Sequence, residues 1–271
     1  MTEKIKLYDD SKCTACRGCQ LACKQWNGLK ASQQRNRGTY QNPPALAHNT
    51  FMIIHYQERV DDKGNFQWLF RKEACMHCTD AACVTVCPSG ALHYNKDTGT
   101  VGLDHDKCIG CKECVAACPF EIPRYDAKTE KVYKCDMCES RITNNLEPAC
   151  VKACPTGALK WGPKDNILKT AAKRVEELGG AANIYGDKYV KGTHFMYVLK
   201  EKAAVYDGIH TNPGVPWSVT LWKSWLKPLS LLGAGGVVAG SFVHYMLHGP
   251  KAPPPEGTNS DNAAGKSEGG E

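Results

Sequence analysis

The sequence predicts an α+β protein made of two small cysteine-rich modules and one apolar helix near the C-terminus. Three observations predict it. Sixteen cysteines in a chain of 271 residues fall into four sets of four. A cysteine-bearing stretch occurs twice, as ACVTVCPSGAL at 82–92 and ACVKACPTGAL at 149–159, with eight of eleven positions identical. A segment of 23 residues without formal charge, 228–250, follows the last cysteine.

Such a cysteine content points to disulfides, zinc sites or iron–sulfur clusters. Disulfide scaffolds are usually short secreted domains, whereas this chain is longer and opens with MTEKIKLYDDSK, which has no apolar stretch typical of a secretion signal. The formal charge of +6 suggests an acidic partner, but four thiolates around a cubane leave a net charge of about −2 per cluster. We therefore expect Lys and Arg to offset cluster charge. No basic run with interleaved aromatics indicates nucleic-acid binding.

The first and third sets share the spacing C-x2-C-x2-C-x3-C, as CTACRGCQLAC at 13–23 and CIGCKECVAACP at 108–119. This spacing is typical of bacterial two-cluster ferredoxins, in which three cysteines hold one cluster and the fourth holds its neighbour. Sets of this kind occur in pairs, so four sets predict four [4Fe–4S] clusters in two ferredoxin-like modules. Zinc is the alternative, but zinc sites usually take two cysteines from each of two knuckles.

The second and fourth sets have a longer middle gap. It is four residues in CMHCTDAACVTVCP at 75–88, and eleven between CDMC at 135–138 and CVKACP at 150–155. An inserted loop can bulge away from a cluster at a small entropic cost. The repeated stretch ends both sets. Each copy has a proline that restrains φ after the outward-pointing cysteine and a glycine that permits a turn: Pro88 and Gly90, Pro155 and Gly157.

Spacing alone leaves two ways to pair the sets. A tandem arrangement pairs the first with the second and the third with the fourth, and a nested one pairs the second with the third and the first with the fourth. Only 20 residues separate the second and third sets, whereas 51 separate the first and second. Those 51 include FMIIHYQERV and FQWLFRK, which predict a β-hairpin around DDKGN. Spacing therefore modestly favours nesting.

The four sets resemble those of the four-cluster electron-transfer subunits of molybdenum and tungsten enzymes. EPACVKACPTGALKWGPK and KGTHFMYVL, followed by an apolar helix, resemble more specifically the iron–sulfur (beta) subunit of membrane-bound formate dehydrogenase, over about residues 8–248. The resemblance implies a nested pairing with these ligands: Cys13, Cys16, Cys19 and Cys154 for one cluster; Cys23, Cys135, Cys138 and Cys150 for a second; Cys75, Cys78, Cys83 and Cys118 for a third; Cys87, Cys108, Cys111 and Cys114 for a fourth.

The predicted organisation is an outer ferredoxin-like module of residues 1–70 and 124–200 with a second module inserted at 71–123. A connector (201–227), a transmembrane helix (228–248) and a Pro- and Gly-rich tail (249–271), expected to be disordered, complete it. Within the outer module, DNILKTAAKRVEELGG predicts a helix with Asp165 as N-cap and Gly179 at its end. THFMYVL at 193–199 predicts a strand.

The uncharged segment would span about 34 Å as a helix, enough for a hydrocarbon core of about 30 Å. A buried core helix is the alternative. The tryptophans that precede it suit a membrane interface: Trp217, Trp222 and Trp225. Gly236 and Gly240 form a G-x-x-x-G step that permits close helix packing, although this pattern is common by chance.

Three histidines are candidates for cofactor contacts. His244 and His248 lie four residues apart in the apolar segment, where a haem would also need a ligand from a facing helix, so we favour a packing role. In the resembled family the haem ligands belong to a separate cytochrome subunit. His77, inside the second set, is interpreted as a hydrogen-bonding neighbour that tunes cluster potential rather than as a ligand.

The charges around the apolar segment give a weak signal for its orientation. Lys223 and Lys227 before it and Lys251 after it would place the cysteine modules in the cytoplasm, but large folded domains can escape this rule. In the resembled family the beta subunit is exported already folded, with the twin-arginine signal of its catalytic partner. We therefore predict a single pass through the inner (cytoplasmic) membrane with the clusters on the periplasmic face.

No catalytic motif accompanies the cysteines: the sequence has no G-x-G-x-x-G, no P-loop and no recognisable nucleophile–base pair. We therefore predict an electron relay that is not an enzyme by itself. The resemblance implies that formate is oxidised at a molybdenum or tungsten bis-pterin centre in a catalytic alpha subunit. Electrons would then cross the four clusters to a cytochrome b (gamma) subunit in the bilayer and a quinone.

Two alternatives remain from the sequence. Subunits of sulfoxide, polysulfide or nitrate reductases, or of hydrogenases, use the same four clusters. Nitrate reductase beta subunits replace one ligand cysteine by tryptophan, and sulfoxide reductase beta subunits lack the terminal helix, which disfavours both. The alternative from another class is a membrane-tethered zinc-binding scaffold, which iron analysis distinguishes.

Overall fold

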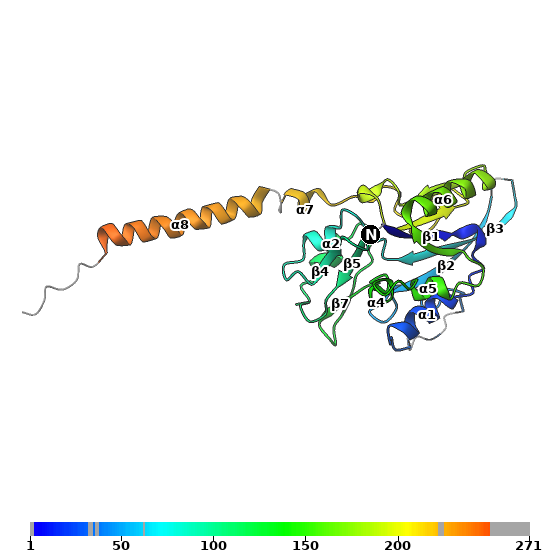
Figure 1. Cartoon of the computed structure of the whole chain (residues 1–271), viewed down its shortest axis with the longest axis horizontal. Coiled ribbons are helices and arrows are strands. Elements are labelled where there is room, and N and C mark those ends of the chain that lie inside the picture. Colours follow the sequence, from blue (N-terminus) through cyan, green and yellow to red (C-terminus); the bar gives the residue numbers. More distant parts are fainter. Residues whose placement is uncertain (1–2, 32–34, 36–37, 62, 222–224, 250–271) are drawn as a thin grey trace, which may run out of the picture. The chain divides into compact units, whose positions relative to one another are not determined.

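The computed structural model describes residues 3–31, 35, 38–61, 63–221 and 225–249. The chain forms two units, Met1–Trp225 and Leu226–Glu271. All sixteen cysteines belong to the first unit, and none of them is in a disulfide. The second unit contains the long C-terminal helix α8 (Figure 1).

A four-stranded sheet joins the beginning of the first unit to its later part, with the strand order β8–β1–β10–β9. Strand β1 (Lys4–Asp9) runs parallel to β10 (Phe195–Leu199) and antiparallel to β8 (Leu159–Pro163). Strand β9 (Asn183–Tyr185) pairs antiparallel with β10. The strand predicted at 193–199 is confirmed, and the N-terminal strand lies at the middle of the sheet.

Helix α6 (Lys164–Leu178) covers one face of this sheet (Figure 1). Its buried residues pack on alternate side chains of the two central strands, which together form an apolar cluster: Ile5, Leu7, Ile167, Ala171, Met196 and Val198. Successive side chains of a strand point to opposite faces. Lys6 and Tyr8 therefore point away from α6, into the side of the unit that carries the cysteines.

The predicted helix is confirmed over most of its length, with one correction. It ends at Gly179, whose φ of 61° is readily adopted by glycine. Its N-cap is Pro163 and not Asp165, so that part of the prediction is wrong. Asp165 lies in the first turn instead, where a carboxylate also interacts favourably with the helix dipole.

Three antiparallel hairpins complete the β-structure. Strands β2 (Met52–Val60) and β3 (Phe66–Ala74) form the hairpin predicted from FMIIHYQERV and FQWLFRK. The shorter pairs are β4 (Leu92–Asn95) with β5 (Thr100–Leu103) and β6 (Arg124–Asp126) with β7 (Lys131–Tyr133). Strands β2 and β3 contribute the buried side chains of Ile53, Ile54 and Leu69 to the main core, which also contains several cysteines.

Short helices lie next to or within the cysteine sets, and three-residue turns and one further short helix link the remaining parts. The helices at the cysteine sets are α1 (Gly18–Trp26), α2 (Ala82–Thr85), α3 (Glu113–Ala117), α4 (Glu139–Ile142) and α5 (Ala149–Lys152). The others are η1 (Asp10–Lys12), η2 (Tyr189–Lys191), η3 (Ala203–Val205) and α7 (Trp217–Leu221). Because most of these helices have only one turn, packing and not helix propensity must stabilise them.

The predicted transmembrane segment is a helix, α8 (Lys227–His248), which is long and apolar enough to cross a membrane. Its side chains are exposed within the chain. The rings of His244 and His248 stack with their centroids 4.7 Å apart. Trp217 and Trp225 are exposed. Trp222, Lys223, Lys251 and nearly all of the predicted tail lie outside the described residues.

Gly110, inside the third cysteine set, permits a close approach between two backbone segments. Its φ is 68°, and a Cβ added there would lie 2.1 Å from the carbonyl oxygen of Glu130 in the β6–β7 turn. Gly90 has the same φ of 68°, but a Cβ there would have nothing within 4 Å. The two glycines therefore share the backbone requirement and differ only in the steric one.

This pair gives a stability prediction. We expect Gly90→Ala to cost about 1–2 kcal/mol, which is the usual penalty for a left-handed alanine. We expect Gly110→Ala to cost more, because the β6–β7 turn must also move. The thermal unfolding midpoint, followed by circular dichroism, should fall further for Gly110→Ala than for Gly90→Ala. Equal midpoints for the two variants would contradict the steric explanation.

Candidate iron–sulfur cluster sites

Three cavities in the first unit are each lined by four cysteines. The empty space between their lining atoms, which includes some open solvent, is about 250, 360 and 310 Å³. They are called here the second site (Cys23, Cys135, Cys138, Cys150), the third site (Cys75, Cys78, Cys83, Cys118) and the fourth site (Cys87, Cys108, Cys111, Cys114). In each, three cysteines come from one set and one comes from another, which is the ligand pattern of two-cluster ferredoxins.

The remaining cysteines are called the first site: Cys13, Cys16, Cys19 and Cys154. The charge of Cys19 acts on Cys13, where it adds to burial in raising the pKa of that thiol. Gly18 lies between Cys16 and the segment that contains Cys154. A Cβ at Gly18 would be 3.7 Å from the Cys16 Sγ and 3.4 Å from the carbonyl oxygen of Ala153. The structure thus brings the loop before α1 close to the end of the fourth set.

The loop at the start of every set has the same backbone turn. The residue two positions after the first cysteine has a positive φ in all four sets: Ala15 (52°), His77 (49°), Gly110 (68°) and Met137 (63°). The amides of Ala15 and Met137 donate to the sulfurs of the cysteines two residues earlier, both at 3.4 Å. The turn therefore directs backbone N–H groups towards the thiols, where they can stabilise negative charge.

The repeated stretch forms a second kind of turn, around Cys87 and Cys154. Gly90 and Gly157 have positive φ, as the sequence predicted. A hydroxyl oxygen lies 3.7 Å from each sulfur, that of Ser89 from Cys87 and that of Thr156 from Cys154. Burial alone would raise the pKa of the Cys87 thiol, but hydrogen bonds from the Leu92 amide and the Ser89 hydroxyl lower it. The pKa of Cys154 is lowered in the same way, by the Leu159 amide and the Thr156 hydroxyl.

For most of the other thiols the pKa is raised and not lowered. Burial raises the pKa of Cys118 and Cys135 to about 11, and that of Cys83, Cys114 and Cys138 to about 12. Neighbouring thiolates of the same sites add to several of these shifts. Thiolate, not thiol, is the form that binds metal. These residues therefore fit ligands that release protons when iron binds.

Among the described residues, no group of three or more His, Cys, Asp or Glu side chains converges closely enough to hold a single metal ion. Zinc needs its thiolates at about 2.3 Å from one point. The four cysteines of the second, third and fourth sites instead surround a cavity. This geometry suits a cluster core that is larger than one ion.

Interactions between neighbouring sites link them into a series. Burial raises the pKa of Cys135 in the second site, and the charge of Cys75 in the third site adds to the rise. Cys114 of the fourth site acts in the same direction on Cys83 of the third. The first and second sites are joined by α1, which carries Cys19 and Cys23. These interactions connect the first site with the second, the second with the third and the third with the fourth.

Two of the sixteen cysteines are exposed, and they belong to the two ends of this series. They are Cys16 in the first site and Cys111 in the fourth. All other cysteines are buried or half-buried. The first and fourth sites thus each have one exposed cysteine, whereas the second and third sites have none.

Three lysines are buried beside these sites: Lys6, Lys72 and Lys134. No pattern in the sequence distinguishes them from the other lysines. Lys6 lines the second cavity and Lys134 lines the third. The Lys134 ammonium donates to the carbonyl oxygens of Val101 and Cys135. Burial disfavours a charged Lys72, but the thiolates of Cys19 and Cys150 more than offset this and raise its pKa. Lys6, Lys72 and Lys134 are therefore the lysines placed to offset thiolate charge at these sites.

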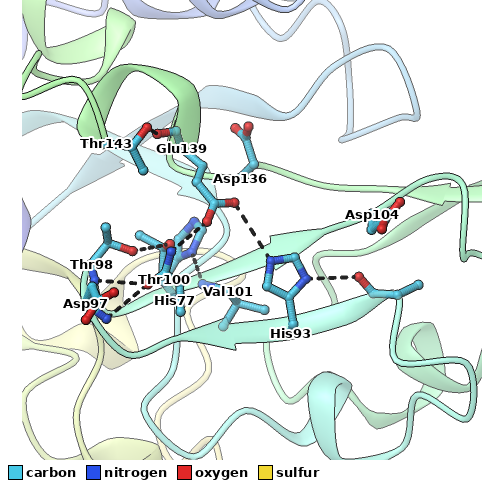
Figure 2. A network of polar contacts seen from close by, with 12 residues as sticks. His77, His93, Asp97, Thr98, Thr100, Val101, Asp104, Asp136, Glu139 and Thr143 are labelled. Atoms are coloured by element: carbon cyan, nitrogen blue, oxygen red, sulfur yellow. Dashed lines mark hydrogen bonds and ion pairs between the residues drawn. The ribbon is translucent and has the colours of Figure 1, made fainter.

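His77 is fully buried between Cys75 and Cys78 of the third site. Its Nδ1 accepts the backbone N–H of Val101 at 3.0 Å. Figure 2 shows this bond within a polar network that also contains His93 and Glu139. Burial, together with the charges of Lys134 and Lys6, lowers the pKa of His77 well below its usual value, so the ring is neutral. Its ring does not line the three cavities.

Comparison with known families agrees with this geometry. Residues 12–91 and residues 66–164 each match a family described as a 4Fe-4S dicluster domain. Two dicluster domains are consistent with four [4Fe–4S] clusters and favour them over zinc. The two matched ranges overlap, so they do not decide between tandem and nested modules. Residues 215–257 match a family described as formate dehydrogenase N, transmembrane.

Individual relatives cover most of the chain. It is 39% identical to the nitrate-inducible formate dehydrogenase iron–sulfur subunit of Escherichia coli K12, over 92% of this chain and 86% of the relative. It is 39% identical to the formate dehydrogenase iron–sulfur subunit of Haemophilus influenzae, over 92% and 81%. It is 42% identical to formate dehydrogenase 2 subunit beta (cytochrome c-553) of Nitratidesulfovibrio vulgaris, over 64% and 83%. The chain therefore belongs to the formate dehydrogenase iron–sulfur subunits, which are electron-transfer subunits of an oxidoreductase complex.

Proposed function

We propose that the four sites each hold one [4Fe–4S] cluster, with the ligands given above. The observation that carries this proposal is the lining of three cavities by three cysteines from one set and one from another. The clusters supply one-electron transfer when bound. The protein holds the ligands, and its buried charges, hydrogen bonds and exclusion of water adjust the reduction potentials.

The modules in this proposal are nested, with 71–123 inserted between 1–70 and 124–200, and with 201–227 as the connector to the helix. Two observations support nesting. The third and fourth cavities draw their cysteines only from residues 75–118. The N-terminal strand β1 pairs with β8 and β10, which follow the inserted segment.

Electrons pass through the sites in a single file in this proposal. The order from first to fourth is supported by helix α1 between the first two sites, by the thiol charges that act between the later sites, and by the exposure of Cys16 and Cys111 at the two ends. An exposed end allows a cofactor of another subunit to approach, whereas the enclosed middle keeps water from the transferred charge.

The two ends connect formate to the membrane. The relatives are subunits of formate dehydrogenases, which supports formate oxidation in a catalytic alpha subunit with a molybdenum or tungsten bis-pterin centre. The match of residues 215–257 and the apolar helix α8 support a single-pass anchor in the inner membrane, beside a cytochrome b subunit that passes electrons to quinone. The clusters lie on the periplasmic face in this proposal, as the resemblance implies.

The ligand assignment predicts which substitutions act on the same cluster. Cys75→Ser and Cys118→Ser should remove or convert the same cluster, although the two residues belong to different sets. Cys114→Ser, only four residues before Cys118, should affect another cluster. Electron paramagnetic resonance of the reduced protein identifies which signal is lost. If Cys118→Ser and Cys114→Ser remove the same signal, the nested assignment is wrong.

The relay predicts that one broken site stops electron flow through the subunit. In the native complex, Cys16→Ser should abolish formate-dependent quinone reduction, because the first cluster is lost or altered. Formate-dependent reduction of a dye at the catalytic subunit should remain. Thr14→Ser, an exposed position in the same loop, is the matched control and should keep both activities. Quinone reduction by Cys16→Ser at the unaltered rate would contradict a single-file relay.

The anchor predicts where truncated chains are found after cell fractionation. Removing residues 227–271 should release the cluster-containing part from the membrane, because α8 supplies the apolar span. Removing only 252–271 should leave the protein in the membrane fraction. Proteolysis of spheroplasts tests the side: a periplasmic cluster unit is cleaved from outside, and full protection would place it in the cytoplasm.

A further inference from the structure

A buried lysine beside the second site has no hydrogen-bond acceptor among the groups that the structure describes. Lys6 is 0% exposed, and its Nζ is unpartnered in this sense. Lys6 lines the cavity formed by the cysteines of the second site. Its neighbours Ile5 and Leu7 pack on the α6 side of the sheet, so the ammonium is directed to the opposite side.

The surroundings hold this ammonium in place. The Lys6 Nζ lies 3.8 Å from the centroid of the Phe195 ring, which is a favourable cation–π position. The backbone N–H of Lys6 donates to the carbonyl oxygen of His194 at 2.9 Å. A ring face offers no lone pair, and a buried unpaired ammonium is costly. A cluster of net charge about −2 in this cavity would offset that cost and provide acceptor sulfurs.

A second buried ammonium, that of Lys72, interacts with cysteines of both the first and the second site. Lys72 is 0% exposed, and its Nζ lies 2.9 Å from the sulfur of Met52, a weak acceptor that also lines the cavity. The Asn27 amide adds a donor 3.6 Å from the Cys23 sulfur. The half-buried carboxylate of Asp136 also lines this cavity and opposes the charge of the two ammonium groups. The second site therefore combines two buried ammonium groups and a side-chain amide with one carboxylate, which leaves the positive charges in excess.

The fourth site differs in these respects. Its cavity is lined mostly by apolar groups besides the cysteines, including Leu92, Leu103 and Val132. Its one lining lysine, Lys112, is exposed. The Lys112 Nζ lies 4.1 Å from the Tyr125 ring centroid. Water screens an exposed charge far more than a buried one.

We propose that the buried ammonium groups of Lys6 and Lys72 raise the reduction potential of the second cluster above that of the fourth. This inference rests on the ligand assignment under Proposed function. One electron arrives from a neighbouring cluster and leaves to the next, and no proton or bond is transferred. Reduction adds one negative charge, which a fixed positive charge nearby stabilises. Lys6 and Lys72 are thus positioning residues that act on the cluster through charge.

The test is a redox titration of the intact complex followed by electron paramagnetic resonance. The signals of the second and fourth clusters are identified as those lost in Cys150→Ser and Cys111→Ser. In Lys6→Gln, the equilibrium constant for reduction of the second cluster should fall at least tenfold. This is a decrease of 59 mV in its one-electron reduction potential. The fourth cluster should not move. Lys6→Arg, which keeps the charge, should recover most of the potential, and Lys112→Gln is the matched control.

The possible results distinguish a failure of the lysine proposal from a failure of the ligand assignment. An unshifted second cluster in Lys6→Gln with full iron content overturns the role of Lys6. If Lys6→Gln does not load iron, the unsubstituted complex decides, because a second cluster that titrates below the fourth overturns the inference. If Cys150→Ser and Cys23→Ser remove different signals, the ligand assignment has failed and this inference with it.

Discussion

The burial of sulfur charge is the constraint on which the rest of this structure depends. Sixteen cysteines lie within one compact unit of residues 1–225, and burial raises the pKa of most of the thiols described above. Thiolates in such surroundings are stable only beside positive charge or hydrogen-bond donors. The positive-φ loops, the hydroxyls of the repeated turn and the three buried lysines all supply one or the other.

Features that depend on residues close together in the sequence were predictable from it. Cysteine spacing predicted the sets, and two strand-like runs around a turn predicted the β2–β3 hairpin. One apolar face predicted α6, and a long uncharged apolar stretch predicted α8. The N-cap of α6 was misassigned because Asp165 has a good capping side chain, whereas the turn from β8 already places Pro163 at that position. Local preference is a weak guide to a helix end where the preceding strand fixes the chain direction.

Such patterns do not predict the buried lysines or the positive-φ turns in the cysteine loops. Lys6 lies in a strand whose charged residues read as solvent-facing, and only the sheet pairing shows that it points inwards. Of the four positive-φ positions in the cysteine loops, only Gly110 has the residue type that signals one; Ala15 and Met137 carry no such signal. Tertiary packing decides both features, and a sequence pattern contains no direct record of it.

The position of β1 has a consequence for biosynthesis. This strand is made first, yet its two partners, β8 and β10, are made only after the last of the sixteen cysteines. The second site likewise joins Cys23 to Cys150, so its pocket cannot close until the ribosome has passed position 150. The third and fourth sites use no cysteine beyond Cys118, and their cavities have no lining residue beyond Lys134. Because distant contacts form slowly, maturation of the subunit should start at the centre of the chain and finish with its two ends.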